Sequence, residues 1–127
     1  MNETSRHYLF VCAANRNRSP TAEGVFRVMA ASAGFDVKVS SAGLSPFSER
    51  AVTKELAGSA DLIFVMEEYM ALELEARYGL DPAKIVCLDI PDIYHRDDPI
   101  LVHILQEALA PFVPYRQSPQ EVLRLPP

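Results

Sequence analysis

The sequence predicts an α/β fold in which four parallel strands form a sheet with crossover helices. Short apolar and β-branched runs alternate along the chain with segments of helical periodicity, which is the pattern of such a sheet. The 127 residues fit one domain, and 49% of them are hydrophobic, enough to bury a core without disulfides or metals. The chain is therefore expected to be an ordinary globular α/β domain.

Four short strands are expected, each followed by a loop or a helix. Residues 8–12 and 61–66 are apolar runs that suit strands buried in a sheet. Residues 37–40 and 85–88 are shorter runs with β-branched residues. Cys87 lies in the last of these runs, where a free cysteine is expected to pack as a small buried hydrophobe.

The helices have recognisable start and stop signals. Ser19 is expected to be the N-cap of the first helix, with Pro20 at its first position, and Gly34 is placed to end it. Further helices are expected near residues 49–56 and from about 67 to 78. The last helix has the clearest periodicity, and Pro111 ends it. Its apolar stripe consists of Leu101, Ile104, Leu105, Ala108 and Leu109.

Proline content divides the chain near its C-terminal end. Five of the ten prolines lie in residues 111–127. We therefore expect one folded domain over residues 1–110 and an extended, proline-rich tail over residues 111–127. Phe112, Tyr115 and Leu123 are the residues through which this tail could dock on the body of the protein or on a partner.

Charge and cysteine content limit the possible settings of the protein. The formal net charge of −5 argues against nucleic acid as a partner, because binding to a phosphate backbone needs clustered positive charge. The N-terminal residues lack the pattern of a signal peptide, and no apolar run is long enough to span a membrane. Two cysteines without export features indicate free thiols in a reducing compartment, so a cytoplasmic location is expected.

The most informative segment is the loop between the first strand and the first helix. Cys12 ends the strand, five residues intervene, and Arg18 and Ser19 follow. A short loop that leads into a helix N-terminus directs backbone N–H groups inward and forms a nest for an anion. Arg18 supplies a planar fork that can clamp two phosphate oxygens. A thiol in this environment ionises readily, and a thiolate is the nucleophile of covalent phosphoryl transfer, so the loop predicts attack of Cys12 on a phosphate ester.

These residues resemble a known family. The run Val-Cys-x-x-Asn-x-x-Arg-Ser-Pro-Thr-Ala-Glu, at residues 11–23, resembles the active-site loop of the low-molecular-weight protein tyrosine phosphatases. The resemblance extends to the Ser-Ala-Gly of residues 41–43 and to the third expected strand at residues 60–67, and it is closest to a bacterial subgroup of predicted tyrosine phosphatases.

The resemblance carries several implications. It implies a three-layer sandwich whose strands lie in the order 2-1-3-4 with helices on both faces, so that residues 1–110 would be a phosphatase domain. It implies a phosphomonoester hydrolase that needs no metal or other cofactor and forms a phosphocysteine intermediate. The substrate would be a phosphorylated protein or a small aryl phosphate.

Site residues follow from the resemblance by position. Cys12 would be the nucleophile, Arg18 the phosphate clamp and Ser19 the partner of the thiolate. Asn15 would hold the shape of the loop through its side chain. Arg16 either adds positive potential or faces solvent. The resemblance places the following loop residues around the substrate phosphate: Ala13, Ala14, Asn15, Arg16 and Asn17.

A carboxylic acid is also required, because the departing oxygen must be protonated. The loop after the last expected strand offers four aspartates, and the carboxyl ends of parallel strands meet at one edge, so this loop can approach Cys12. The family acid precedes a proline, which favours Asp98, with Asp97 second and Asp92 third. Asp97 and Asp98 also stand where the last helix favours carboxylates at its N-terminus.

Three positions depart from the family pattern. Ala14 stands where glycine is usual, so the backbone there must avoid conformations closed to alanine. Asn17 stands where a second cysteine is frequent in the family. Ile100 follows Asp98-Pro99 in place of an aromatic residue that packs on the substrate ring. Phe47 or Tyr94 could supply that aromatic wall instead, and either could equally be an ordinary surface or core residue.

Two other functions stay open. Arsenate reductases of this fold use a similar oxyanion loop, but they need further cysteines to carry oxidation away, and only Cys87 is available. A phosphate-binding regulatory module would keep the loop without turnover. The three histidines lack metal-ligand spacing, so no metal site is expected. The sequence does not indicate an oligomeric state.

Overall fold

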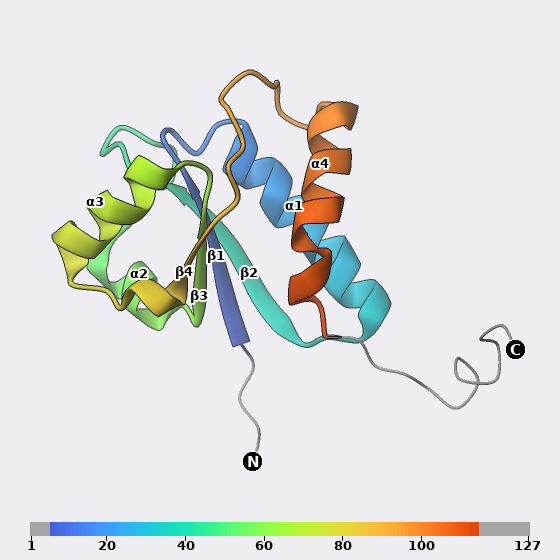
Figure 1. Cartoon of the computed structure of the whole chain (residues 1–127), viewed down its shortest axis with the longest axis horizontal. Helices are drawn as coiled ribbons and strands as arrows, with labels where there is room; N and C mark the ends of the chain where they lie inside the picture. The colour runs from blue at the N-terminus through green and yellow to red at the C-terminus, as the bar shows by residue number, and fades with distance from the viewer. Residues whose placement is uncertain (1–5, 115–127) are drawn as a thin grey trace, which may run out of the picture.

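Four parallel strands form one sheet in the order β2-β1-β3-β4 in the computed structural model, which describes residues 6–114 (Figure 1). The strands are β1 (Arg6–Cys12), β2 (Val37–Gly43), β3 (Leu62–Val65) and β4 (Ile85–Cys87). The central strands β1 and β3 are paired in register over four residues, from Tyr8 with Leu62 to Val11 with Val65. The fold class and the strand order expected from the sequence are confirmed.

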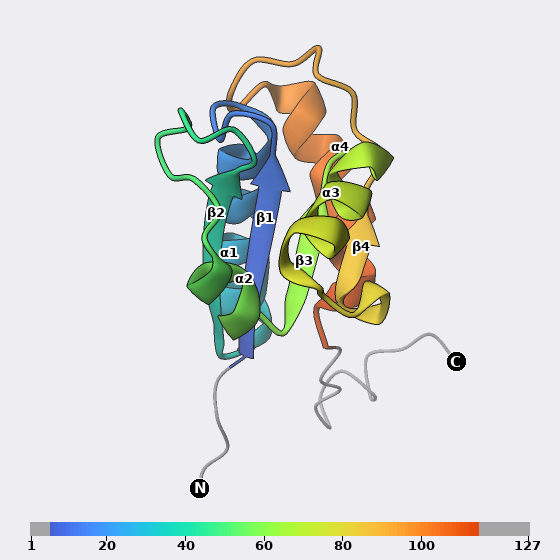
Figure 2. The same cartoon turned by 90° about the vertical axis from the view of Figure 1, so that its left-hand side faces the viewer.

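Helices cover both faces of this sheet. They are α1 (Arg18–Ala33), α2 (Lys54–Ser59), α3 (Glu68–Tyr78) and α4 (Pro99–Leu109), with short 3-10 turns at Pro82–Lys84 and Ala110–Phe112. Helices α1 and α4 lie on one face, and α2 and α3 lie on the other, as Figures 1 and 2 show from two directions. Within residues 6–114, no helix is long and apolar enough to cross a membrane.

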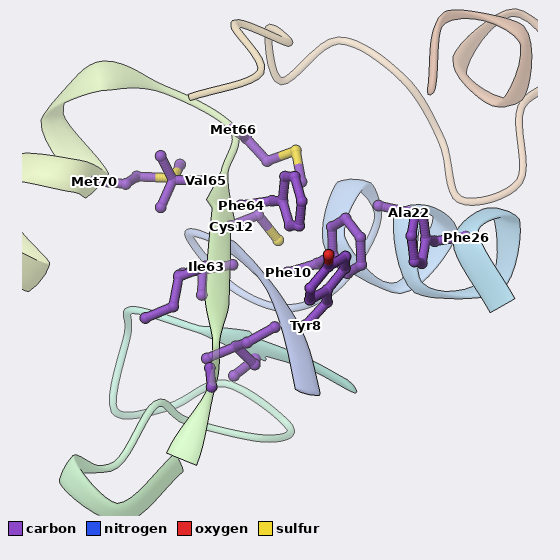
Figure 3. Packing of buried hydrophobic residues seen from close by; sticks show 14 of the residues in the cluster. Tyr8, Phe10, Cys12, Ala22, Phe26, Ile63, Phe64, Val65, Met66 and Met70 are labelled. Atoms are coloured by element: carbon purple, nitrogen blue, oxygen red, sulfur yellow. The ribbon is translucent and has the colours of Figure 1, made fainter. Parts of the chain in front are cut away.

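Aromatic side chains fill the layer between the sheet and α1. The rings of Phe10 and Phe64, on neighbouring strands, stack with their centroids 4.8 Å apart, and Phe26 of α1 packs against Tyr8 at 5.3 Å (Figure 3). Side chains alternate between the two faces of a strand, so Cys12 shares its face with Tyr8 and Phe10. The sulfur of Cys12 therefore lies on the side of the sheet that α1 covers.

Helix α1 begins differently from the expectation. Its first residue is Arg18 and Asn17 holds the N-cap position, so the prediction that Ser19 would be the N-cap was wrong. Ser19 is fully buried, and its hydroxyl contacts Cys12 instead of a helix N–H group. The C-terminal end is as predicted: Gly34 adopts a left-handed conformation and closes the helix.

Two further expectations need correction. The helix expected near residues 49–56 is α2 at Lys54–Ser59, because Thr53 accepts a hydrogen bond from Leu56 N and caps the helix there. Ala51, inside the expected helix, instead forms a parallel bridge with Gly43. Cys87 is half-buried rather than buried, because β4 is the three-residue edge strand of the sheet.

The C-terminal part of the described chain stays on the body of the protein. Phe112, which falls in the expected tail, packs edge-on against Phe64 with ring centroids 4.9 Å apart. The boundary predicted between residues 110 and 111 falls inside the 3-10 turn Ala110–Phe112, and the two-part division of the chain stays a prediction. Tyr115 and Leu123 lie outside the described residues.

His7 is a buried polar residue of β1, at the end of the strand opposite to Cys12. Only 6% of the residue is exposed, and its ring nitrogens lie 2.6 Å from Ser40 Oγ and 3.2 Å from Ser59 Oγ. Burial, and next the positive charge of Lys38, lower the pKa of His7 from its usual value of 6.5. The folded protein thus favours the neutral imidazole.

We expect acidification to destabilise the fold through His7. Because the folded-state pKa is below the unfolded one, the unfolded chain binds the proton more tightly, and stability is lost as the pH falls below about 6.5. The melting temperature should fall between about pH 7 and pH 5, and it should fall less steeply in His7→Gln. Equal slopes for the two proteins would show that His7 does not contribute.

Candidate active site

A pocket of about 130 Å³ opens at the C-terminal end of β1. The loop between β1 and α1 supplies almost all of its lining, and one residue comes from the loop after β4. The lining residues are Cys12, Ala13, Ala14, Arg16, Asn17, Arg18 and Asp92. Four of the five residues expected around the phosphate therefore line the pocket, together with Cys12 and Arg18.

Hydrogen bonds from the segment that follows β2 fix the orientation of this loop. The carbonyl of Cys12 accepts from Leu44 N and that of Ala13 accepts from Ser45 N, both at 2.9 Å. In a trans peptide the N–H points opposite to the carbonyl, so the N–H groups of Ala13 and Ala14 point away from this support. They are thereby directed to the pocket that both residues line, as an anion nest requires.

Gly43 allows the loop to sit this close to β2. A Cβ atom added at Gly43 would lie 2.8 Å from two backbone atoms, Ala14 C and Asn15 N. Real Cβ atoms do not approach backbone at that distance, so any other residue would push the loop out of place. The Ser-Ala-Gly segment noted in the sequence thus supports the nucleophile loop directly.

A chain of buried polar side chains leads to the sulfur of Cys12. The Sγ atom lies 3.0 Å from Ser19 Oγ. Asn15 Nδ2 donates to Ser19 Oγ at 2.9 Å and to Ser41 Oγ at 3.0 Å, and Ser41 in turn donates to Glu23 at 2.6 Å. The hydroxyl proton of Ser19 has two acceptors within reach, the sulfur of Cys12 and the carbonyl of Ala42 at 3.4 Å, and donation to the sulfur stabilises a thiolate.

Backbone conformation in the loop agrees with the residues present. Asn15 has a φ of 53°, a left-handed conformation that asparagine tolerates better than most residues. Ala14 is not among the described residues with positive φ, so the alanine that replaces the family's glycine is unstrained. Asn15 does not line the catalytic pocket. It lies behind the loop and supports it.

Arg18 is the first residue of α1 and is only 2% exposed. Its Nη1 atom donates to the carbonyl of Ile90 at 2.6 Å and lies 3.5 Å from a carboxylate oxygen of Glu67. Its Nε atom lies 3.8 Å from Asp92 Oδ1. Residues at the ends of β3 and β4 therefore hold the guanidinium against the pocket.

The loop after β4 places its aspartates in different settings. Asp92 lines the catalytic pocket, and its side chain is 64% exposed. Asp98 is the N-cap of α4, where Oδ1 accepts from Ile100 N at 2.9 Å. The backbone N–H of Asp97 donates to Thr21 of α1 at 2.9 Å, which anchors the loop. Of these aspartates, only Asp92 is brought to Cys12 and Arg18.

The expected aromatic walls are not part of the pocket lining. Phe47 is 94% exposed on the segment after β2, and Tyr94 is half-buried against the core. Another aromatic residue interacts electrostatically with the charged groups of the site: Tyr69, at the start of α3, is 51% exposed. Burial and then the Glu67 carboxylate raise the pKa of Tyr69, while Arg18 lowers it.

Glu67 and Tyr69 were not found by sequence analysis, and Asp92 was ranked last of three. Glu67 and Tyr69 follow the strand at residues 60–67, so their place at the carboxyl end of a parallel strand was a signal for both. For Asp92, the signal was Tyr94 two residues later. The family pattern has an acidic residue, a proline and then an aromatic residue, and Asp92-Ile93-Tyr94 departs from it only at the proline. Among residues 6–114, no group of three His, Cys, Asp or Glu side chains could hold a metal ion.

Comparison with known proteins supports the interpretation of this loop. The model of the family described as "Low molecular weight phosphotyrosine protein phosphatase" matches residues 7–60. That segment contains the whole nucleophile loop and the Ser-Ala-Gly that supports it. The expected family resemblance is confirmed.

Several solved phosphatases share the fold of this chain. The tyrosine phosphatase Wzb from Escherichia coli K30, in complex with phosphate, is 21% identical with a TM-score of 0.70, and the match covers 87% of this chain and 97% of that one. A low molecular weight protein tyrosine phosphatase from Bacillus subtilis is 25% identical (TM-score 0.61, 81% and 96% covered). A YwlE arginine phosphatase mutant with a phosphorylated active-site serine is 24% identical (TM-score 0.69, 84% and 93% covered). No curated protein matches the sequence.

The match to this family model supports the enzyme class expected from the sequence, a phosphoric monoester hydrolase of the low-molecular-weight phosphatase type. The matched segment includes Cys12, Arg18 and Ser19, whereas Glu67 and Asp92 lie beyond it. The description of the matching family, a phosphotyrosine protein phosphatase, names phosphorylated proteins as the substrates of its members.

Proposed function

We propose that the protein is a cysteine-dependent protein phosphatase in which Cys12 forms a phosphocysteine intermediate. The observation that carries this proposal is the position of Cys12 Sγ in the pocket, 3.0 Å from Ser19 Oγ, with Arg18 in the same lining. The thiolate attacks phosphorus, an S–P bond forms, and the bond from phosphorus to the substrate oxygen breaks. The loop N–H groups and Arg18 hold the phosphoryl oxygens throughout.

Asp92 is the proposed general acid, in place of the Asp98 favoured by the sequence. Asp92 lines the pocket, where it can protonate the departing oxygen and afterwards, as a carboxylate, take a proton from the water that hydrolyses phosphocysteine. That second step releases inorganic phosphate and restores the thiolate. Asp98 instead uses its carboxylate to cap α4.

Phosphotyrosine is the proposed target residue. Arg16 lines the pocket, is exposed, and has no hydrogen-bond or ion-pair partner among the described residues. Its positive charge would repel the guanidinium of phosphoarginine and does not oppose a neutral phenyl ring. The exposed ring of Tyr69 beside Glu67 offers one aromatic surface for that phenyl group.

The alternative of an arsenate reductase finds little support in the geometry. Strand β3 lies between β1, which carries Cys12, and β4, which carries Cys87. Two strand spacings amount to about 10 Å, whereas the Cα atoms of a disulfide lie at most about 7 Å apart. Burial also raises the pKa of the Cys87 thiol, which makes it a poor attacking group.

A reducing, cytoplasmic setting is proposed because the mechanism needs Cys12 as a free thiol.

The experiment that tests this function is hydrolysis by the wild-type protein with a metal chelator present. We expect steady release of phosphate from an activated aryl phosphate and from a phosphotyrosine peptide. Release from a phosphoarginine peptide should be slower than from the phosphotyrosine peptide. Binding of inorganic phosphate without any turnover would instead favour the silent phosphate-binding module. Turnover that stops on chelation would contradict the metal-free mechanism.

A further inference from the structure

A second, larger pocket adjoins the catalytic one behind the nucleophile loop. It has a volume of about 340 Å³. Asn15 lines it, whereas the neighbouring loop residues Ala14 and Arg16 line the catalytic pocket, so the two pockets share the loop as a wall. Its lining residues are Asn15, Pro20, Glu23, Ser41, Glu49, Arg50 and Arg96.

The path of the chain brings two arginines to this pocket from opposite edges of the sheet. Arg50 belongs to the segment after the edge strand β2, and Arg96 belongs to the loop after the other edge strand, β4. That loop crosses above the end of the sheet to reach α4 (Figure 1). The hydrogen bond from Asp97 N to Thr21 fixes it against α1 one residue after Arg96.

Some of the charged side chains around this pocket have ion-pair partners and others have none. Glu23 accepts from Ser41 and forms an ion pair with Arg27 at 2.7 Å, so its carboxylate is already neutralised. Arg50 and Arg96 are exposed, and their guanidinium groups have no hydrogen-bond or ion-pair partner within residues 6–114.

Arg16, in the adjoining catalytic pocket, is likewise unpaired among the described residues, and the one unpaired carboxylate in the larger pocket is that of Glu49. The two pockets together thus hold three arginine side chains without partners and one such glutamate, on a chain whose overall charge is −5.

Near the ends of β3 and β4, by contrast, the positive charge of Arg18 is already balanced by carboxylates. Arg18 lies within 4 Å of the two carboxylates of Glu67 and Asp92. A negative group of the substrate next to the phosphate would therefore be repelled on the side of Glu67 and attracted on the side of Arg96 and Arg50. This charge distribution would orient an acidic substrate so that its negative group lies on the side of Arg96 and Arg50.

We propose that the second pocket binds an acidic side chain next to the phosphorylated residue of a protein substrate. The proposal rests on the proposed function, because the phosphate itself must occupy the loop at Cys12. Arg96 and Arg50 attract the acidic group, and Glu49 limits how strongly they do so. Each exposed ion pair contributes little binding free energy. We therefore expect the two arginines together to give a preference of about three- to tenfold for the acidic substrate.

The test compares two phosphotyrosine peptides that differ only at the flanking positions, Asp and Glu in one and Asn and Gln in the other. Wild type should give a kcat/KM about three- to tenfold higher for the acidic peptide at low salt. The preference should shrink as ionic strength rises, because exposed charges are screened. The double variant Arg50→Gln/Arg96→Gln should lose the preference, while Glu49→Gln should increase it.

A control and a separate substrate make the outcomes distinct. Arg6→Gln removes one positive charge at the opposite end of β1 and should leave the preference as in wild type. An activated aryl phosphate, which has no flanking groups, measures the catalytic step alone, so absence of its turnover would refute the phosphatase function itself. If aryl phosphate is turned over but the wild type uses both peptides equally, the acidic-subsite proposal is overturned. The same holds if Arg50→Gln/Arg96→Gln and Glu49→Gln shift the preference in the same direction.

Discussion

Cys12→Ser should abolish steady-state hydrolysis, with a loss in kcat of at least about a thousandfold. A serine hydroxyl in the same position is ionised far less than a thiol, so the first bond to phosphorus forms very slowly, although the hydroxyl can replace the contact to Ser19. The change removes one buried sulfur and leaves the N–H groups of the loop in place. Inorganic phosphate should therefore still raise the melting temperature of the variant, because it binds the folded protein alone.

The other cysteine provides the matched control. Cys87 is half-buried on the edge strand β4, its sulfur donates to Asp89, and it does not line the catalytic pocket. Cys87→Ser should keep the wild-type rate with an aryl phosphate. Hydrolysis that persists in Cys12→Ser, or that disappears in Cys87→Ser while the fold is intact, would contradict the assignment of the nucleophile.

Asp92→Ala should show the second large effect, and the effect should depend on the leaving group. Proton donation by a positioned acid is worth about a hundredfold or more when the leaving oxygen is basic, and less when it is activated. The kcat for a phosphotyrosine peptide should therefore fall by about a hundredfold, and that for an activated aryl phosphate should fall less. Measurement of kcat against leaving-group pKa in the wild type and the variant gives the two slopes to compare.

Asp98→Ala is the comparison that separates catalysis from helix capping. Loss of an N-cap lowers stability by about 1 kcal/mol, because Ile100 N loses its acceptor in α4. The dependence on the leaving group should stay as in wild type. If Asp98→Ala produces the leaving-group effect and Asp92→Ala does not, the sequence ranking was right and the structural assignment is wrong.

The nucleophile loop could be predicted from sequence because its parts are contiguous. Cys12, Asn15, Arg18 and Ser19 fall within eight residues, between an apolar strand and a helix with clear signals. The same holds for the parallel sheet, since apolar runs of strand length alternate with helical segments. The exact start of α1 was missed because Ser19 and Pro20 are a typical helix-start pair, and sequence alone does not show that the serine faces a buried sulfur.

The general acid and the carboxylates that contact Arg18 could not be identified from the sequence in this way, because their positions depend on the path of loops. Asp98-Pro99 matched the family's acid and proline, but that pair also forms an N-cap followed by proline, which is a common start of a helix. In the structure the capping function holds, and the crossing loop brings Asp92 to the pocket instead. Glu67 precedes α3, where a carboxylate is expected for helix stability, so its contact with Arg18 needed coordinates.

The most direct test of the central claim is to trap the phosphorylated enzyme. Asp92→Ala mixed with an activated aryl phosphate and quenched rapidly in acid should accumulate the intermediate, because its formation needs little acid catalysis while its hydrolysis needs the base. Mass spectrometry of the digested protein should find one phosphoryl group on the peptide that contains Cys12. Phosphate on another residue, or release of the aryl alcohol at full rate with an unmodified Cys12 at every time point, would contradict a phosphocysteine mechanism.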